Sequence, residues 1–229
     1  MLIPAQYLQK VIAFFEEAGD PKIAEGQMNY MRNQFEFYGV KAPKWVKFSK
    51  EIFKRENIFR QDDLKKFVRL CLKAEHRELH YFALQMVEKV SKKEEENFIE
   101  FLEELILTKS WWDTVDWISK MVSGHFLRFP HQTKTVTERW IASDNIWLQR
   151  VAIIFQRYKN YPTNEQMLFN YILRVKDTDE FFIQKGAGWA LREHSKIRPE
   201  AVVHFVENNH LPPLTRKEGL KWLKRVGRV

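Results

Sequence analysis

The sequence predicts an all-α protein, in the form of a curved α-solenoid of stacked helix pairs with a concave basic surface. Three observations predict it. Apolar residues recur at helical spacing along almost the whole chain, and no segment sustains the period of two that a strand requires. Signals for helix starts recur roughly every 15 to 20 residues, so helix pairs would recur about every 40 residues, the length range of helical repeats.

The helical spacing is clearest in three segments that place apolar residues at i, i+3, i+4 and i+7. These residues are Leu8, Val11, Ile12 and Phe15; Leu79, Phe82, Ala83, Met86 and Val90; and Leu148, Val151, Ala152 and Phe155. Each stripe covers one face of a helix, and we expect that face to lie in the core.

Proline and capping residues mark the expected helix starts. Asp20-Pro21 combines an N-cap with a first-turn proline. Further breaks fall at Pro43, Pro130, Pro162, Pro199 and Pro212-Pro213. Capping boxes are predicted for Ser91 with Glu94, Thr163 with Gln166, Asp177 with Glu180, and Thr215 with Glu218.

Composition restricts the class of protein. The 229 residues are 45% hydrophobic and 30% charged, as in soluble globular proteins, and no flexible linker interrupts them, so one domain is predicted over 1–229. The net charge of +8 and the pI of about 9.4 favour a polyanionic partner. The basic run from Pro212 to Val229 is typical of a solvated helix face or of a phosphate-contacting end.

Neither a disulfide, a membrane span nor a metal site is predicted. The single cysteine, Cys71, lies in an apolar stripe and is expected to be a buried, inert thiol. Without a leader segment or a long apolar run, the chain is expected to be cytoplasmic. His76, Glu78 and His80 lack the spacing of a zinc-protease motif and are expected at the surface.

The most unusual stretch, residues 108–116, has the sequence T-K-S-W-W-D-T-V-D. On a helix, Trp111 and Val115 would begin the buried stripe, whereas Trp112 and Asp116 would be i, i+4 neighbours on an adjacent face. Spacing alone favours a tryptophan at the rim of the core beside an exposed aspartate.

A second stretch, W-I-A-S-D-N-I-W-L-Q-R, ends at Arg150, beside the apolar stripe of its helix. The planar guanidinium could bind a phosphate or pair with a neighbouring carboxylate. From the spacing alone, the ion pair is the favoured interpretation.

The third stretch, F-F-I-Q-K-G-A-G-W-A-L-R-E, carries Trp189 between Lys185 and Arg192, away from the inner stripe. Interleaved tryptophan and cations suit nucleic acid, since cations meet phosphates and rings meet sugars or bases. Gly186 and Gly188 weaken a helix by about 1 kcal/mol each relative to alanine, which indicates that a backbone, a helix or a ligand comes close there.

Together and in this order, the three stretches resemble the AlkD-like alkylpurine DNA glycosylases, bacterial repair proteins built from HEAT-like helical repeats. The resemblance extends from Asn29-Tyr30-Met31 to the region of Trp222. Two features depart from the family's pattern and bear on the geometry of the site. In Gly186-Ala187-Gly188 a bulkier residue is expected beside the last glycine, and Trp117 directly follows the second aspartate.

The resemblance implies a catalytic group made of Asp116, Trp112 and Trp189. The first two correspond to the family's catalytic pair, and Trp189 corresponds to the second wall of the cleft. Developing positive charge on the sugar would be stabilised by the carboxylate and by the faces of the two indole rings.

The resemblance also implies four DNA-binding residues. Arg150 corresponds to the arginine that holds the DNA backbone near the lesion, and Tyr30 to an aromatic residue near the damaged nucleotide. Lys185 and Arg192 are expected to help position the backbone.

The implied activity is hydrolysis of the N-glycosidic bond of cationic N3- and N7-alkylpurines in double-stranded DNA, by a monomer, without base flipping, cofactor or metal. Two alternatives are a non-catalytic protein that binds unusual DNA structures and a helical scaffold that grips acidic proteins. The presence of both Asp116 and Trp112 favours the enzyme. The sequence does not distinguish N3-methyladenine, N7-methylguanine and bulkier adducts as substrates.

Overall fold

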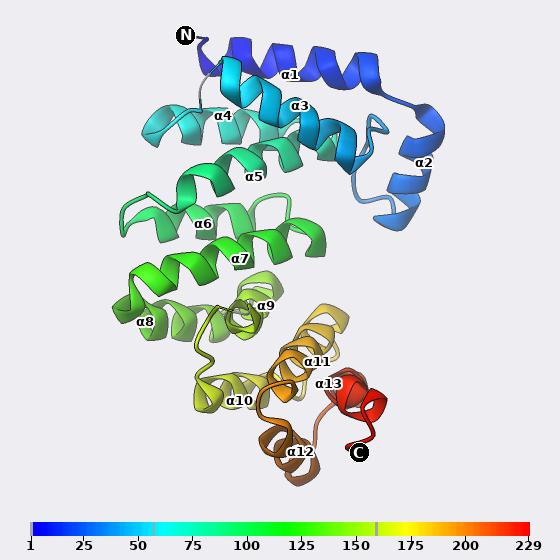
Figure 1. Cartoon of the computed structure of the whole chain (residues 1–229), viewed down its shortest axis with the longest axis vertical. Helices are drawn as coiled ribbons and strands as arrows, with labels where there is room; N and C mark the ends of the chain where they lie inside the picture. The colour runs from blue at the N-terminus through cyan, green and yellow to red at the C-terminus, as the bar shows by residue number, and fades with distance from the viewer. Residues whose placement is uncertain (1, 57, 159) are drawn as a thin grey trace. The chain divides into compact units, whose positions relative to one another are not determined.

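The computed structural model describes residues 2–56, 58–158 and 160–229. These residues form helices and no strand, apart from an isolated bridge between Glu36 and His76, so the predicted all-α class is confirmed (Figure 1). The helices are α1 (Pro4–Ala18), α2 (Pro21–Tyr30), α3 (Ala42–Arg55), α4 (Gln61–Lys73), α5 (Arg77–Ser91), α6 (Phe98–Leu107), α7 (Trp112–Arg128), α8 (Pro130–Ile141), α9 (Ile146–Ile154), the 3₁₀ turn η1 (Phe155–Arg157), α10 (Glu165–Arg174), α11 (Phe181–Ser195), α12 (Pro199–Asn208) and α13 (Pro213–Arg225).

The chain divides into two compact units, Met1–Phe101 and Leu102–Val229. In the first unit, α1 packs on α4 and α5, and both α3 and α4 pack on α5. In the second unit, α7, α8 and α9 pack on one another, α9 contacts α10 and α11, and α11 packs on α12 and α13. Within each unit, helices that are near neighbours in sequence therefore pack together, as in helical repeat proteins. The single domain over 1–229 stays a prediction.

The predicted apolar stripes form the core. All five residues of the stripe from Leu79 to Val90 are at most 2% exposed, and the stripe from Leu148 to Phe155 is equally buried along most of its length. Only Ile12 of the first stripe is partly exposed. Helix α9 is buried on almost every side, including Arg150, and this burial decides the geometry of the site described below.

Prolines begin several helices, as predicted. Pro21, Pro130, Pro199 and Pro213 are the first residues of α2, α8, α12 and α13. The side chain of Asp20 accepts hydrogen bonds from two backbone N–H groups of the first turn of α2, at 2.9 and 3.2 Å. The proline ring fixes a helical φ where no N–H partner is needed, which explains its position at these starts.

The predicted capping boxes are wrong. Ser91 ends α5, and Thr163 precedes the actual N-cap of α10, Asn164. Helix α11 begins without a side-chain cap. Thr215 lies inside α13, where its hydroxyl donates to the backbone carbonyl of Gln184 at 3.1 Å. The capping pattern also arises where these side chains make tertiary contacts, so the pattern alone does not locate a helix start.

Glu78 and His80 are fully buried, which contradicts the prediction that they lie at the surface. The carboxylate of Glu78 accepts hydrogen bonds from the backbone N–H groups of Tyr38, Gly39 and Val40, at 3.1, 2.9 and 3.1 Å. These bonds compensate for the loss of water around the charge. Glu78 thereby fixes the loop between α2 and α3, a structural role that helical spacing could not reveal.

The described part of the chain contains no group of three or more His, Cys, Asp or Glu side chains placed to hold a metal ion. None of the helices described is long and apolar enough to cross a membrane. Cys71 is fully buried in α4, as predicted, and burial raises the pKa of its thiol. A thiol kept protonated in this way is inert.

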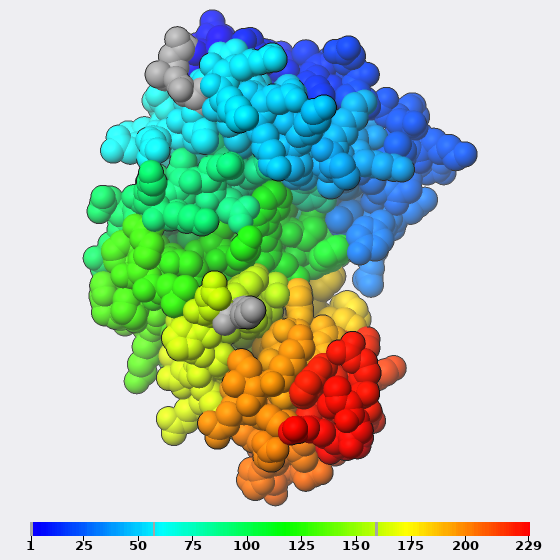
Figure 2. Space-filling view, viewed as in Figure 1, coloured from blue at the N-terminus to red at the C-terminus, as the bar shows by residue number. Residues whose placement is uncertain are grey.

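Helices α11 and α13 pack closely because glycines lie at their contact. A Cβ added at Gly188 would lie 2.6 Å from the Cβ of Glu218 and 2.9 Å from the backbone oxygen of Thr215. A Cβ added at Gly219 would lie 3.1 Å from the Cβ of Leu191. In Figure 2 the red atoms of α13 lie directly against the orange atoms of the preceding helices. The expected close approach at Gly188 is therefore that of a neighbouring helix.

We expect Gly188→Ala to lower the free energy of unfolding by about 1–3 kcal/mol, because overpacking against α13 outweighs the helix propensity gained. Gly124→Ala is the matched control, since Gly124 also lies within a helix and an added Cβ there meets no atom within 4 Å. That control should gain about 0.5–1 kcal/mol. Denaturant unfolding measures both changes, and equal stability of the two variants would contradict a close helix contact at Gly188.

Candidate active site

Asp116 lies on α7, one turn after Trp112, the first residue of that helix. Val115 is fully buried, as predicted, whereas the side chain of Asp116 is 15% exposed. Trp111 precedes the helix in an extended conformation, with φ of −157° and ψ of 162°. Its ring packs against Phe182 of α11, with 5.0 Å between ring centroids. The first turn of α7 is thus anchored to α11 by apolar contact.

Arg150 holds the carboxylate of Asp116 in a bidentate ion pair. Its Nε donates to Oδ1 at 2.8 Å and its Nη2 donates to Oδ2 at 2.9 Å. Its Nη1 donates to the backbone carbonyl of Phe182. The side chain of Arg150 is only 4% exposed. One buried guanidinium on α9 therefore joins the carboxylate of α7 to the backbone of α11. The planar guanidinium of arginine can form these parallel hydrogen bonds, whereas the single ammonium of lysine cannot.

Gly186 makes room for this guanidinium. A Cβ added at Gly186 would lie 2.9 Å from Nη1 of Arg150 and 3.6 Å from its Cγ. The glycine pair of α11 thus serves two contacts, because Gly186 accommodates Arg150 and Gly188 accommodates α13.

The ion pair that the spacing favoured for Arg150 is confirmed. The phosphate contact that the resemblance implied stays a prediction, and the structure lends it no support. Three of the guanidinium's N–H groups are already used, and the side chain is withdrawn from solvent.

Lys185 and Arg192, also expected to contact DNA, both donate to Glu218 of α13. The Nζ of Lys185 lies 2.8 Å from Oε1 of Glu218, and Nη1 of Arg192 lies 2.9 Å from Oε2. Burial raises the pKa of Glu218, but the hydrogen bond from Lys185 and the surrounding cations more than offset it, so its pKa lies below the ordinary value. Both cations therefore help to hold α11 on α13, and their contact with DNA stays a prediction.

Trp189 of α11 is covered by a residue that sequence reasoning missed. The guanidinium carbon of Arg157 lies 3.5 Å from the centroid of the Trp189 ring. Nη2 of Arg157 donates to the hydroxyl of Tyr158 at 2.8 Å, and that hydroxyl donates to the backbone oxygen of Asp116 at 2.8 Å. Trp189 and Asp116 are thus linked through Arg157 and Tyr158. The available signal was a basic and aromatic pair directly after the apolar stripe of α9.

Burial shifts the pKa values of Arg157 and Tyr158. Burial lowers the pKa of Arg157, since the charged form loses water. Burial also raises the pKa of Tyr158. Tyr158 therefore stays protonated at neutral pH and keeps the proton that it donates to Asp116.

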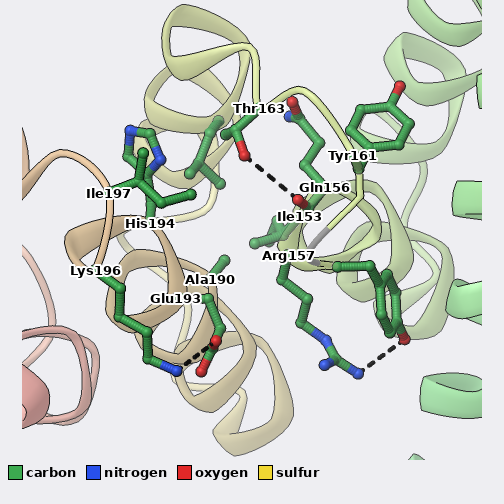
Figure 3. Close-up of a pocket in the computed structure, with 12 residues that line it drawn as sticks. Ile153, Gln156, Arg157, Tyr161, Thr163, Ala190, Glu193, His194, Lys196 and Ile197 are labelled. Carbon is green, nitrogen blue, oxygen red and sulfur yellow. Dashed lines mark hydrogen bonds and ion pairs between the residues drawn. The ribbon is translucent and has the colours of Figure 1, made fainter.

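A pocket of about 340 Å³ lies beside Arg157 and is lined by residues of α9, η1, α10 and α11 and of the loops that follow η1 and α11 (Figure 3). Its apolar lining includes Ile153, Leu168 and Ala190. Arg157 lies at one wall, and Lys196 lies at another, where it is paired with Glu193. The pocket thus lies next to Arg157 and Tyr158, and neither Asp116 nor Arg150 is among the residues that line it.

Tyr30 is the last residue of α2 and is 69% exposed. It belongs to the first unit, whereas the other six predicted site residues belong to the second. Among these six, direct contact joins Asp116 to Arg150, and Lys185 and Arg192 share one carboxylate. The proposed role of Tyr30 stays a prediction.

We expect Arg150→Ala to lower the free energy of unfolding by about 3–5 kcal/mol, because it leaves the carboxylate of Asp116 without its partner and a void in the core. Arg174→Ala is the control, since Arg174 pairs with Glu138 at the surface, where such a pair contributes about 1 kcal/mol or less. Denaturant unfolding tests this, and an Arg150→Ala loss as small as that of the control would refute a stabilising role for the buried pair.

Solved structures similar to this chain include three that cover most of it. A predicted DNA alkylation repair enzyme from Enterococcus faecalis is 29% identical, with a TM-score of 0.83 over 90% of this chain and 96% of that one. AlkD2 from Streptococcus mutans is 18% identical, with a TM-score of 0.60 over 77% of this chain and 89% of its own. The smu.31 protein of Streptococcus mutans UA159 is 17% identical, with a TM-score of 0.61 over 78% and 92%. The last two show likeness of fold alone.

No curated protein matches the sequence. The model of one family does match, over residues 11–223, which is almost the whole chain. That span includes α7, α9 and α11, the three helices that carry the Asp116–Arg150 ion pair and Trp189. The chain belongs to the DNA alkylation repair enzyme family.

Proposed function

We propose that the protein is a monofunctional DNA glycosylase that hydrolyses the N-glycosidic bond of cationic N3- and N7-alkylpurines in double-stranded DNA, without base flipping. Membership of the DNA alkylation repair enzyme family supports a role in DNA repair. The observation that carries the finer proposal is the carboxylate of Asp116, which is 15% exposed on one side and fixed on the other by a buried bidentate arginine.

The chemistry needs little more than such a carboxylate. An alkylated purine already carries positive charge, so it departs as a neutral base and requires no general acid. The sugar becomes oxocarbenium-like in the transition state, as in the hydrolysis of glycosides. A carboxylate held near C1′ stabilises that charge and accepts a hydrogen bond from the attacking water.

Asp116 suits this role because its position is fixed before substrate arrives. Arg150 supplies two parallel hydrogen bonds and Tyr158 bonds the backbone oxygen of the same residue. Preorganised charge costs no reorganisation during the reaction. In this account Arg150 is a positioning residue that acts through Asp116.

The two tryptophans flank the carboxylate in the proposal. Trp112 lies one helical turn before Asp116, and Trp189 is connected to it through Arg157 and Tyr158. Their ring faces favour the cationic sugar. Tyr30, Lys185 and Arg192 are proposed to contact the DNA around the lesion, and the damaged base is proposed to stay stacked in the duplex.

We expect Asp116→Asn to keep DNA binding and to lose most release of 7-methylguanine, because the neutral amide no longer stabilises the sugar cation. Single-turnover base release from a methylated duplex measures this. Asp113→Asn, three residues earlier on the same helix, is the matched control and should excise at the wild-type rate.

Two outcomes decide the proposal. Normal excision by Asp116→Asn would show that another group stabilises the transition state. A wild-type protein that binds duplex DNA but releases no alkylated base would favour the non-catalytic alternative, a protein that binds unusual DNA structures.

A further inference from the structure

We propose that Arg157 binds a backbone phosphate of the DNA beside the reacting nucleotide, in the place that the resemblance gave to Arg150. This inference rests on the proposed function, because it names the protein group that holds the substrate at the same site. Three observations support it. Arg157 forms no ion pair among the described residues, the neighbouring carboxylates pair with other cations, and contacts with Trp189 and Tyr158 fix the plane of the guanidinium.

Arg157 has no anionic partner within the described residues. Its contacts there are the face of Trp189, at 3.5 Å, the face of Tyr158, at 4.3 Å, and the hydrogen bond from Nη2 to the Tyr158 hydroxyl. Its Nε is buried and has no hydrogen-bond partner among the described residues. A half-buried cation in this state is costly, and burial accordingly lowers its pKa. An incoming anion would relieve that cost.

The carboxylates nearest to Arg157 are already paired with other cations. Asp116 uses both oxygens on Arg150. Glu193 pairs with Lys196 at 2.6 Å, on the far side of the pocket from Arg157 (Figure 3). Neither carboxylate lies within 4.0 Å of Arg157 among the ion pairs of the described residues. Asp116 and Glu193 therefore act on Arg157 only at longer range, and their attraction raises its pKa by less than burial lowers it.

The other predicted DNA-binding cations of α9 and α11 are held by carboxylates. Arg150 is buried on Asp116, and Lys185 and Arg192 share Glu218. A phosphate that approaches any of them also meets the negative charge of that carboxylate. No carboxylate forms an ion pair with Arg157 among the described residues, so the electrostatic gain on binding is larger there.

The guanidinium is also preorganised. Stacking on Trp189 and the bond to Tyr158 fix its plane, so little side-chain entropy is lost when an anion binds. The guanidinium thus contacts the indole ring of Trp189 directly and is joined to the backbone oxygen of Asp116 through the hydroxyl of Tyr158. A phosphate held by Nη1 would therefore place the attached sugar next to Trp189 and Asp116.

The test is the salt dependence of binding to a 7-methylguanine duplex, measured by fluorescence anisotropy for wild type, Arg157→Gln and Arg157→Lys. Each phosphate neutralised contributes about 0.9 to the slope of log affinity against log salt. We expect the slope of Arg157→Gln to fall by about 0.9 and its affinity to weaken severalfold. Arg157→Lys keeps the charge and should keep the slope.

Arg139→Gln is the matched control, since Arg139 also lies on a helix of the second unit and is paired with Glu103 through two hydrogen bonds. Its slope should equal that of wild type. Thermal unfolding checks that each variant folds. If Arg157→Gln does not fold, Arg157→Met, which retains packing on the Trp189 ring, is measured in its place with the same expected slope.

The outcomes separate this inference from the proposed function. A wild type that binds and excises, with an unchanged slope in Arg157→Gln or Arg157→Met, overturns the phosphate contact and leaves the glycosylase proposal standing. A lower slope in the neutral variants but not in Arg157→Lys supports the contact even if no base is released. A wild type that does not bind DNA overturns both.

Discussion

The second unit is organised around one buried ion pair, in which Arg150 grips Asp116. Removing both charges from water is expensive, and only good geometry with further hydrogen bonds compensates for it. Here the bidentate contact and the bond to the carbonyl of Phe182 provide that geometry. A Cβ at Gly186 would lie 2.9 Å from Nη1 of Arg150, so a side chain there would displace the guanidinium. Helices α7, α9 and α11 are thereby fixed relative to one another at the point where the chemistry is proposed.

The cations of the unit divide into three roles once their partners are compared. Arg150 holds the carboxylate in position, and Lys185 and Arg192 hold α11 against α13 through Glu218. Arg157 stacks on an indole and forms no ion pair with a carboxylate among the described residues, and it is the cation proposed to bind a phosphate beside the reacting nucleotide. A net charge of +8 favours a polyanionic partner for the whole molecule, and the carboxylates that pair with individual cations modulate the attraction at each of them.

Helical spacing predicted the class and the core well, because burial of one apolar stripe per helix dominates the energetics. It could not predict that Arg150 is buried, since α9 is enclosed on nearly every side and spacing gives only an angle around the helix. Glu78 was misplaced at the surface for a similar reason, as its partners are backbone groups about 40 residues earlier. Arg157 follows the end of α9 in a 3₁₀ turn, where no periodicity applies. The ordered motifs, by contrast, correctly indicated the family.

If Arg150 acts through Asp116, the two residues have coupled effects on base release, and a double-mutant cycle under single-turnover conditions measures that coupling. Wild type, Arg150→Lys, Asp116→Asn and the double variant are compared on one methylated duplex. We expect Arg150→Lys to slow release in the wild-type background and to have no further effect once Asp116 is replaced. Independent, multiplicative losses in the two backgrounds would contradict it.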